Sequence, residues 1–190
     1  MAFQKVSSLE LADKLATAFR TQGYEGASLT SLSELTGLEK ASLYHRFPGG
    51  KDQMLDAALN HVQQWFTQNV LDPLAQPGDP AKKLRIASQR IREFYRDGLR
   101  PCVLDTLSLH TSNDALQSKL SEALRASYLT WHDAFYRLAR ESGIPTATAK
   151  SRAEQAIVEI EGSLVVSRAT ASSQPFLRAI ALLPALLLNP

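Results

Sequence analysis

The sequence predicts an all-helical protein in which a short three-helix unit precedes a longer helical region. Apolar residues recur at spacings of three and four along nearly the whole chain, whereas the alternation typical of strands is scarce. Glycine- and proline-containing breaks separate the helical segments. A chain of 190 residues with 44% hydrophobic residues can bury a core without disulfides. We therefore expect an all-α fold with an N-terminal domain over 1–50 and a C-terminal helical domain over 51–190.

Three short segments make up the first domain. The first carries an apolar stripe and ends at Gly23, which suits a left-handed position after a helix. The second begins after Ser28, a good N-cap, and runs to Gly37, with Leu35 the last of three apolar positions at three-residue spacing. The third covers residues 38–47. Each is near or below the length at which an isolated helix is stable, so we expect the three to pack together.

Longer helical patterns occupy the rest of the chain. A proline- and glycine-rich stretch at 72–80 predicts a loop, and shorter breaks follow it. The expected helices cover residues 51–71, 80–97, 101–111, 114–142, 146–171 and 175–188.

Two short helices joined by a tight glycine turn predict a helix-turn-helix, whose second helix enters the DNA major groove. On a helical wheel the outward side of the third segment carries Ala41, Ser42, His45 and Arg46, which are small, hydroxyl-bearing or cationic. Residues 40–51 hold three cations and no acid, although residues 1–61 as a whole are slightly acidic. The alternative is a small helical subdomain with a solvated polar face.

The run at 28–38, the Leu-Tyr-His-Arg-Phe sequence at 43–47 and Lys51 together resemble the DNA-binding region of the tetracycline-repressor (TetR) family. The resemblance implies a role for each matching position. Ser28 and Thr30 lie near the DNA backbone, Lys40, Ala41 and Ser42 face bases, and Tyr44, Arg46 and Lys51 contact phosphates.

The sequence departs from the family pattern at two places. Glu39 stands where many members have a serine cap, which weakens the cap and brings an acid near phosphates. The turn at 47–51, Phe-Pro-Gly-Gly-Lys, is one residue longer than the common form. This variant resembles a subgroup of regulators that respond to flavonoids and lincomycin-type drugs.

The last two predicted helices are apolar on several sides, and part of that surface is expected to be the chain's own core. The resemblance implies that the remainder forms a four-helix homodimer interface, which presents two recognition helices to a palindromic operator. The predicted dimer residues are Ile157, Ile160, Leu164, Phe176, Ile180, Leu183 and Leu187.

Aromatic residues at helical spacing predict either ordinary core or a pocket for a flat apolar ligand, lined by aromatic rings with a few polar groups. The predicted ligand-binding residues are Trp65, Phe94, Ser108, His110, Tyr128, Trp131, His132 and Phe135.

Several classes of protein are disfavoured. The net charge of +2 gives no whole-molecule attraction to polyanions, so any DNA contact must be local. Cys102 is the only cysteine, which excludes an internal disulfide and favours a reducing cytoplasm. No catalytic motif, cofactor motif or metal-ligand spacing is found. No apolar stretch is long enough to span a membrane, so we expect a cytoplasmic protein without membrane contact.

These observations favour a ligand-responsive one-component transcriptional regulator. We expect a repressor that binds a palindromic operator as a homodimer and leaves it when a small apolar or aromatic effector binds. A ligand-independent DNA-binding regulator of the same fold is the first alternative. A helical enzyme is the second, and the lack of a catalytic motif counts against it.

Overall fold

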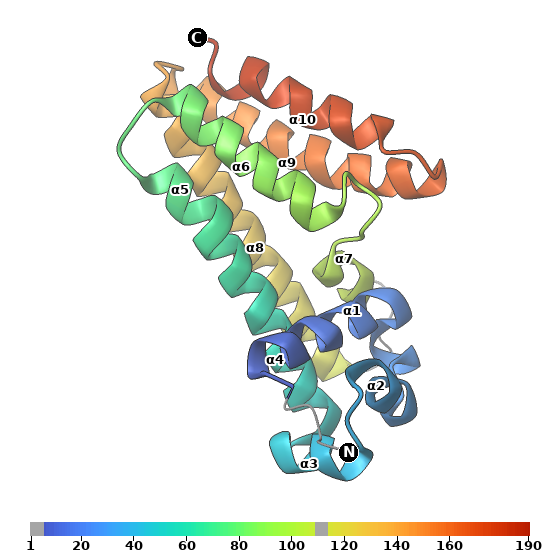
Figure 1. Cartoon of the computed structure of the whole chain (residues 1–190). Helices are drawn as coiled ribbons and strands as arrows, with labels where there is room; N and C mark the ends of the chain where they lie inside the picture. The colour runs from blue at the N-terminus through green and yellow to red at the C-terminus, as the bar shows by residue number, and fades with distance from the viewer. Residues whose placement is uncertain (1–5, 109–113) are drawn as a thin grey trace. The chain divides into compact units, whose positions relative to one another are not determined.

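The computed structural model describes residues 6–108 and 114–190, and every regular element in these residues is a helix (Figure 1). The all-α prediction is confirmed. The chain divides into two compact units, which we call the N-terminal unit (Met1–Gln64 with Val103–Ser121) and the C-terminal unit (Trp65–Cys102 with Glu122–Pro190). This division differs from the predicted boundary at residue 50. The reason is that the first part of α4 (Gly50–Phe66) is bonded to α1 (Ser8–Gly26).

The N-terminal unit contains α1, α2 (Leu29–Thr36), α3 (Lys40–Arg46), most of α4, α7 (Val103–Ser108) and the start of α8 (Asp114–Glu141). Helix α1 contacts α2 and α7, and α2 contacts α3. Fully buried apolar side chains from α1 to α4 form its core, namely Leu15, Phe19, Leu32, Leu43, Met54 and Leu55. Burial at this level explains how α2 and α3, with 8 and 7 residues too short to be stable alone, are held against α1 and α4.

Glycines break the chain at both predicted positions. Gly23 has a φ of 69°, but its ψ of 179° is extended, and one more turn follows it before α1 ends at Gly26. Gly37 caps α2 in the left-handed conformation, with φ 72° and ψ 18°. The apolar stripe predicted for α2 includes Leu35, but Leu35 is exposed. Thr36 is buried instead, because Leu32 and Thr36 lie one helical turn apart and share a face.

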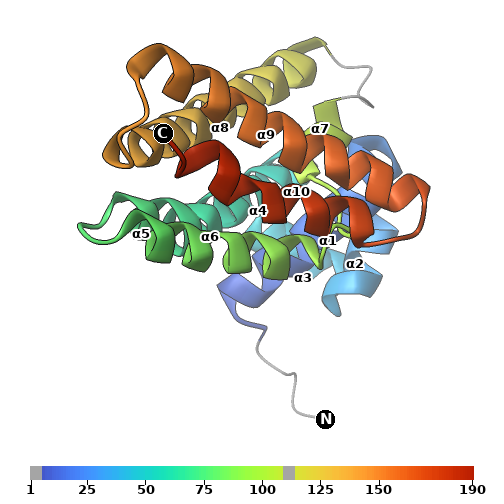
Figure 2. The same ribbon diagram turned by 90° about the horizontal axis from the view of Figure 1, so that it is seen from above.

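The C-terminal unit contains the end of α4, a π-helical turn at Thr67–Leu71, α5 (Asp72–Ala75), α6 (Pro80–Tyr95), most of α8, α9 (Thr146–Ala169) and α10 (Gln174–Leu187). Helices α9 and α10 pack side by side, as the view in Figure 2 shows. Helix α10 also contacts α6. The remaining expected helices agree with the observed ones to within a few residues, and residues 109–111 of the segment 101–111 lie outside the described part of the chain.

The loop expected at 72–80 is shorter than predicted. Residues 72–75 are helical, because Pro73 lies in the first turn of α5, where a helix does not need the missing N–H group. Asp79 then caps α6, its carboxylate accepting hydrogen bonds from the N–H groups of Ala81 and Lys82 at 3.2 Å each.

None of the described helices is both long enough and apolar enough to cross a bilayer.

Candidate nucleic-acid interface

The turn between α2 and α3 is fixed by local hydrogen bonds and by burial on both sides. Ser33 Oγ donates a hydrogen bond to the Leu38 carbonyl at 2.6 Å, and the Gly37 N–H donates to the Ser33 carbonyl at 3.0 Å. Leu32 on α2 and Leu43 on α3 are completely buried. These contacts hold α3 at a defined angle to α2, as a helix-turn-helix requires.

The side chains of α3 divide sharply between core and solvent. Leu43 alone is buried, so the helix is anchored along one edge. All six DNA-contacting residues predicted on α3 are exposed, namely Lys40, Ala41, Ser42, Tyr44, His45 and Arg46. This exposure is what contact with base edges and phosphates needs. The division of these residues between bases and phosphates stays a prediction.

The N-terminus of α3 is uncapped by any side chain. Glu39 occupies the N-cap position with the extended backbone typical of a cap, φ −63° and ψ 150°, but its carboxylate makes no cap hydrogen bond. By contrast Ser28 Oγ accepts a hydrogen bond from the Ser31 N–H at 3.1 Å and caps α2. Thr30 is exposed in the first turn of α2.

Lys51 is held in place by α1. Its Nζ donates a hydrogen bond to the Tyr24 carbonyl at 2.9 Å and lies 4.1 Å from the centre of the Tyr24 ring. The Tyr24 hydroxyl donates in turn to the carboxylate of Asp52. Burial, together with this hydrogen bond to Asp52, raises the pKa of Tyr24 above its ordinary range. Neither Tyr24 nor Asp52 is among the site residues predicted from the sequence.

Arg46 and the glycine turn at 49–50 also belong to the candidate DNA-binding surface. Arg46 Nη1 donates to the Val6 carbonyl at 3.0 Å, so its guanidinium bridges α3 and the segment before α1. Gly50 has a φ of 68°, a conformation that other residues adopt at a cost. The Gly49 N–H donates to Gln53 Oε1 at 2.9 Å. The extra residue of this turn is therefore accommodated by a positive φ and a side-chain cap on α4.

The described members of the predicted ligand-binding set are divided between the two units. Trp65, Phe94 and Trp131 belong to an aromatic cluster in the C-terminal unit around Phe66, with ring centres 4.4 Å apart for Phe66 and Phe94 and 5.0 Å for Phe66 and Trp131. Phe135 joins it through Trp131 at 5.8 Å. These rings pack against one another, as core aromatics do.

The polar members of that set differ in burial and in the unit to which they belong. Tyr128 is exposed on α8 and pairs with the half-buried His132 at 5.8 Å between ring centres. His132 Nε2 is 3.1 Å from the Lys150 carbonyl. Ser108 belongs to the N-terminal unit and donates to the Asp105 carbonyl at 3.0 Å. His110 lies outside the described residues.

The predicted dimer residues are mostly covered within the single chain, and their role in a dimer stays a prediction. Ile160, Leu164, Phe176, Ile180, Leu183 and Leu187 are all buried in the single chain, and Ile157 is half-buried. Helices α9 and α10 pack against each other, and Phe176 also contacts Tyr95 on α6 with ring centres 6.1 Å apart, so part of this surface is core within one protomer. The apolar side chains that remain exposed on the two helices are different ones, namely Val158, Val165, Val166 and Leu182.

Within residues 6–108 and 114–190, no group of three or more histidine, cysteine, aspartate or glutamate side chains is placed to hold a metal ion.

Helix α3 follows a glycine turn, is anchored by the buried Leu43 and exposes a cationic face. This arrangement defines a helix-turn-helix DNA-binding protein. Residues 5–58 match the family model of bacterial regulatory proteins of the tetR family, and residues 80–181 match the C-terminal domain of LmrA/YxaF-like transcriptional regulators. The second match covers more than half of the chain. The chain belongs to the TetR family of transcriptional regulators. It is therefore a DNA-binding regulator and not an enzyme.

The chain aligns with related regulators over most of its own length and of theirs. The chain is 28% identical over 172 residues to the HTH-type transcriptional regulator LmrA of Bacillus subtilis, covering 89% of this chain and 90% of that protein. It is 24% identical to YxaF of the same organism, covering 88% of both chains. A TetR regulator from Legionella pneumophila has the same fold, with a TM-score of 0.77, 14% identity and coverage of 98% and 100%. A CifR mutant solved with a 26-base-pair operator has a TM-score of 0.71, 22% identity and coverage of 98% and 97%.

Proposed function

We propose that this regulator is a repressor that binds a palindromic operator as a homodimer and leaves it when a small apolar or aromatic effector binds. The observation that carries the proposal is the outward face of α3, where every side chain except Leu43 is exposed and three can bear a positive charge. A structural neighbour, the CifR mutant, was solved on operator DNA. The protein then acts in the cytoplasm, where the DNA lies.

The homodimer rests on the exposed face of α9. Val158, Gly162 and Val165 lie at spacings of four and three, so they share one side of the helix. Val158 is 61% exposed and Val165 52% exposed, which is unusual for apolar side chains in line on a stable helix. Leu182 adds an exposed apolar group on α10. A second copy related by a two-fold axis buries this stripe against itself and presents two α3 helices to one operator.

The effector site is proposed in the aromatic cluster of the C-terminal unit. Trp65 is half-buried at the edge of the cluster and packs on Phe94 with ring centres 4.7 Å apart. A flat apolar molecule that parts these rings replaces one aromatic contact by another. Tyr128 and His132, which belong to the same unit, are the proposed polar contributors, whereas Ser108 belongs to the N-terminal unit and His110 lies outside the described residues. Release of DNA follows if the effector binds more tightly to the conformation whose recognition helices no longer fit the operator.

The close packing of the aromatic rings also favours a second candidate, a regulator of the same fold that responds to no ligand. Phe66 contacts Phe94, Tyr95 and Trp131 with ring centres 4.4 to 5.9 Å apart, which is ordinary core packing.

One series of experiments separates these candidates. Genomic fragments retained by the purified protein are sequenced, and binding to the recovered site is measured at several salt concentrations. Compounds, flavonoids among them, are then tested for thermal stabilisation of the protein and for release of that fragment. A palindromic site released by a stabilising compound supports the full proposal. A palindromic site that no compound releases favours the ligand-independent regulator, and salt-insensitive or absent DNA binding contradicts both.

A further inference from the structure

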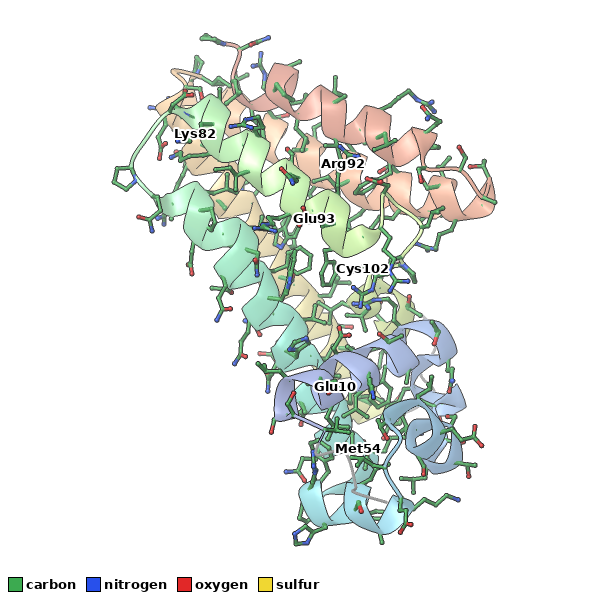
Figure 3. The ribbon with its side chains drawn as sticks, viewed as in Figure 1. Glu10, Met54, Lys82, Arg92, Glu93 and Cys102 are labelled. Carbon is green, nitrogen blue, oxygen red and sulfur yellow. The ribbon has the colours of Figure 1, made fainter. Side chains whose placement is uncertain are left out.

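A groove of about 780 Å³ lies between α6 and α10 in the C-terminal unit. The residues of the aromatic cluster do not line it, so it is distinct from the effector site proposed above. Its volume falls in the range of small-molecule sites. Figure 3 labels Arg92 and Glu93 on α6, two of the residues that line it.

The two walls of the groove differ in chemistry. Arg85, Arg92 and Arg96 come from α6 and its C-cap at spacings of seven and four, so they follow one side of that helix over about 16 Å. Ile180, Pro184 and Leu188 come from α10 at spacings of four and form an apolar wall. A cationic row facing an apolar row suits a ligand that is itself amphipathic, with an anionic group at one end.

Two carboxylates also line the groove, and each already has a cationic or amide partner. Asp97 accepts a hydrogen bond from Arg92 Nε at 2.8 Å. Glu93 accepts from Arg90 at 2.8 Å and from Gln89 at 3.0 Å, and the bond from Arg90 lowers the pKa of Glu93. Both carboxylates lie toward the C-terminal end of α6. At the other end, Arg85 is exposed and forms no ion pair with any described residue.

Because of the direction of the two helices, the apolar wall of α10 lies opposite the whole row of arginines on α6. Gly98, just after α6, lies against Phe176 at the start of α10, so the two helices run antiparallel. Arg85 is therefore at the Leu188 end, and the C-terminal end of α6 is near Ile180. The N–H that Pro184 lacks also leaves the Ile180 carbonyl without its helical partner one turn on, which adds one acceptor beside the apolar wall.

We propose that the groove between α6 and α10 binds an aliphatic chain that ends in a carboxylate, such as a free fatty acid. The carboxylate of the ligand pairs with Arg85, at the end of the groove that no acidic side chain lines. The hydrocarbon chain lies along Pro184 toward Ile180. A guanidinium binds a carboxylate through two parallel hydrogen bonds, which fixes the orientation of the ligand.

The test measures binding of octanoate, decanoate and laurate to the purified full-length protein, below the micellar range and without DNA. We expect affinity to rise by about fourfold per added methylene while the chain stays in the groove. Lauryl alcohol and lauryl trimethylammonium, which share the chain and lack the carboxylate, are expected to bind at least tenfold more weakly than laurate. Laurate is expected to raise the thermal midpoint of the protein.

Variants locate the site. Arg85→Gln is expected to weaken laurate binding about tenfold, whereas the matched control Arg125→Gln, at an exposed arginine on α8, leaves it unchanged. Pro184→Glu brings a negative charge into the groove and abolishes binding, and Pro184→Ala retains it. Because Pro184 is exposed, both of its variants are expected to fold.

Three results overturn the proposal. The first is equal binding by Arg85→Gln and wild type, and the second is equal binding of laurate and lauryl trimethylammonium. The third is a fall in the thermal midpoint with laurate, which marks surfactant action. Since no DNA is present, each of these leaves the proposed function untouched, and loss of DNA binding in Lys51→Ala leaves this proposal untouched.

Discussion

The ammonium group of Lys51 donates a hydrogen bond to the Tyr24 carbonyl at 2.9 Å and lies over the ring of the same tyrosine. Residues 27 positions apart in sequence are thus joined at the start of α4. The contact restrains a flexible side chain, which would lower the entropy lost on binding a phosphate, the role predicted for Lys51.

Removal of this cation is expected to weaken binding to all DNA sequences alike. Lys51→Ala loses one phosphate contact, so affinity falls roughly tenfold and the slope of log affinity against log salt decreases by about one. Titrations of an operator and an unrelated duplex at several salt concentrations measure both quantities. Lys82→Ala, at an exposed lysine on α6, is the matched control. An unchanged slope for Lys51→Ala would remove Lys51 from the interface.

Changes at the base-facing positions are expected to alter preference and not merely strength. Lys40→Ala and Ser42→Ala remove donors from the exposed side of α3, so the loss is largest for operators that carry the base pair each residue reads, by about 1–3 kcal/mol. Selection of bound sequences from a random pool measures the change. Equal loss on every sequence would assign these residues to the DNA backbone.

Alkaline pH tests the hydrogen bond from Tyr24 to Asp52. The raised pKa means that folded Tyr24 keeps its proton above pH 10, where an unfolded tyrosine loses its own. The folded state then binds more protons than the unfolded state, so the free energy of unfolding falls as pH rises above about 10. Tyr24→Phe is expected to show a shallower fall in this window, measured by urea unfolding at pH 9 to 11, roughly one unit to either side of the tyrosine pKa.

The control for that measurement is Tyr136→Phe, a change in the part of α8 that belongs to the C-terminal unit. It is expected to follow the wild-type curve. Coincident curves for wild type and Tyr24→Phe would show that the phenol ionises as easily when folded as when unfolded.

A cap is expected to stabilise α3. Glu39 already has the extended backbone of an N-cap, so Glu39→Ser adds a hydroxyl acceptor where none acts now and stabilises the protein by about 1 kcal/mol. Glu39→Ala removes the same charge without adding a cap, which separates the two effects in thermal unfolding. If both variants unfold at the same temperature, serine does not cap α3.

Charges on the exposed stripe of α9 are expected to separate the proposed dimer. Val158→Lys places a like charge opposite itself across a two-fold axis, and since Val158 is 61% exposed the protomer keeps its fold. Sedimentation velocity at micromolar concentration measures the change of mass. Leu129→Lys, at an exposed leucine on α8, is the control, and a dimer that survives Val158→Lys would place the interface elsewhere.

Apolar periodicity was enough to predict the helices, because each buried stripe must recur with the helical repeat. The helix-turn-helix followed from Ser28, Gly37 and the outward face of α3, all of which are local features. Contacts between residues far apart in the sequence produce no comparable local pattern. Nothing in the sequence near Lys51 shows that its ammonium bonds to the Tyr24 carbonyl, or that the Tyr24 hydroxyl bonds to Asp52.

The dimer residues illustrate the same limit. A wheel identifies the apolar sides of α9 and α10, but the neighbouring helix decides which side the chain covers for itself. Ile160 and Leu183, which the sequence predicts at a partner interface, are completely buried within the single chain. Val158 and Val165, which are exposed, are not among the predicted dimer residues.

Gly98 sets a mechanical constraint on the C-terminal unit. Its φ of 92° disfavours any other residue, and a side-chain carbon at this position would come within 2.4 Å of Phe176 Cβ. With so little clearance, the end of α6 cannot shift toward α10 without pushing Phe176 ahead of it. A displacement of the end of α6 toward α10 therefore also displaces α10, and with it α9, against which α10 packs.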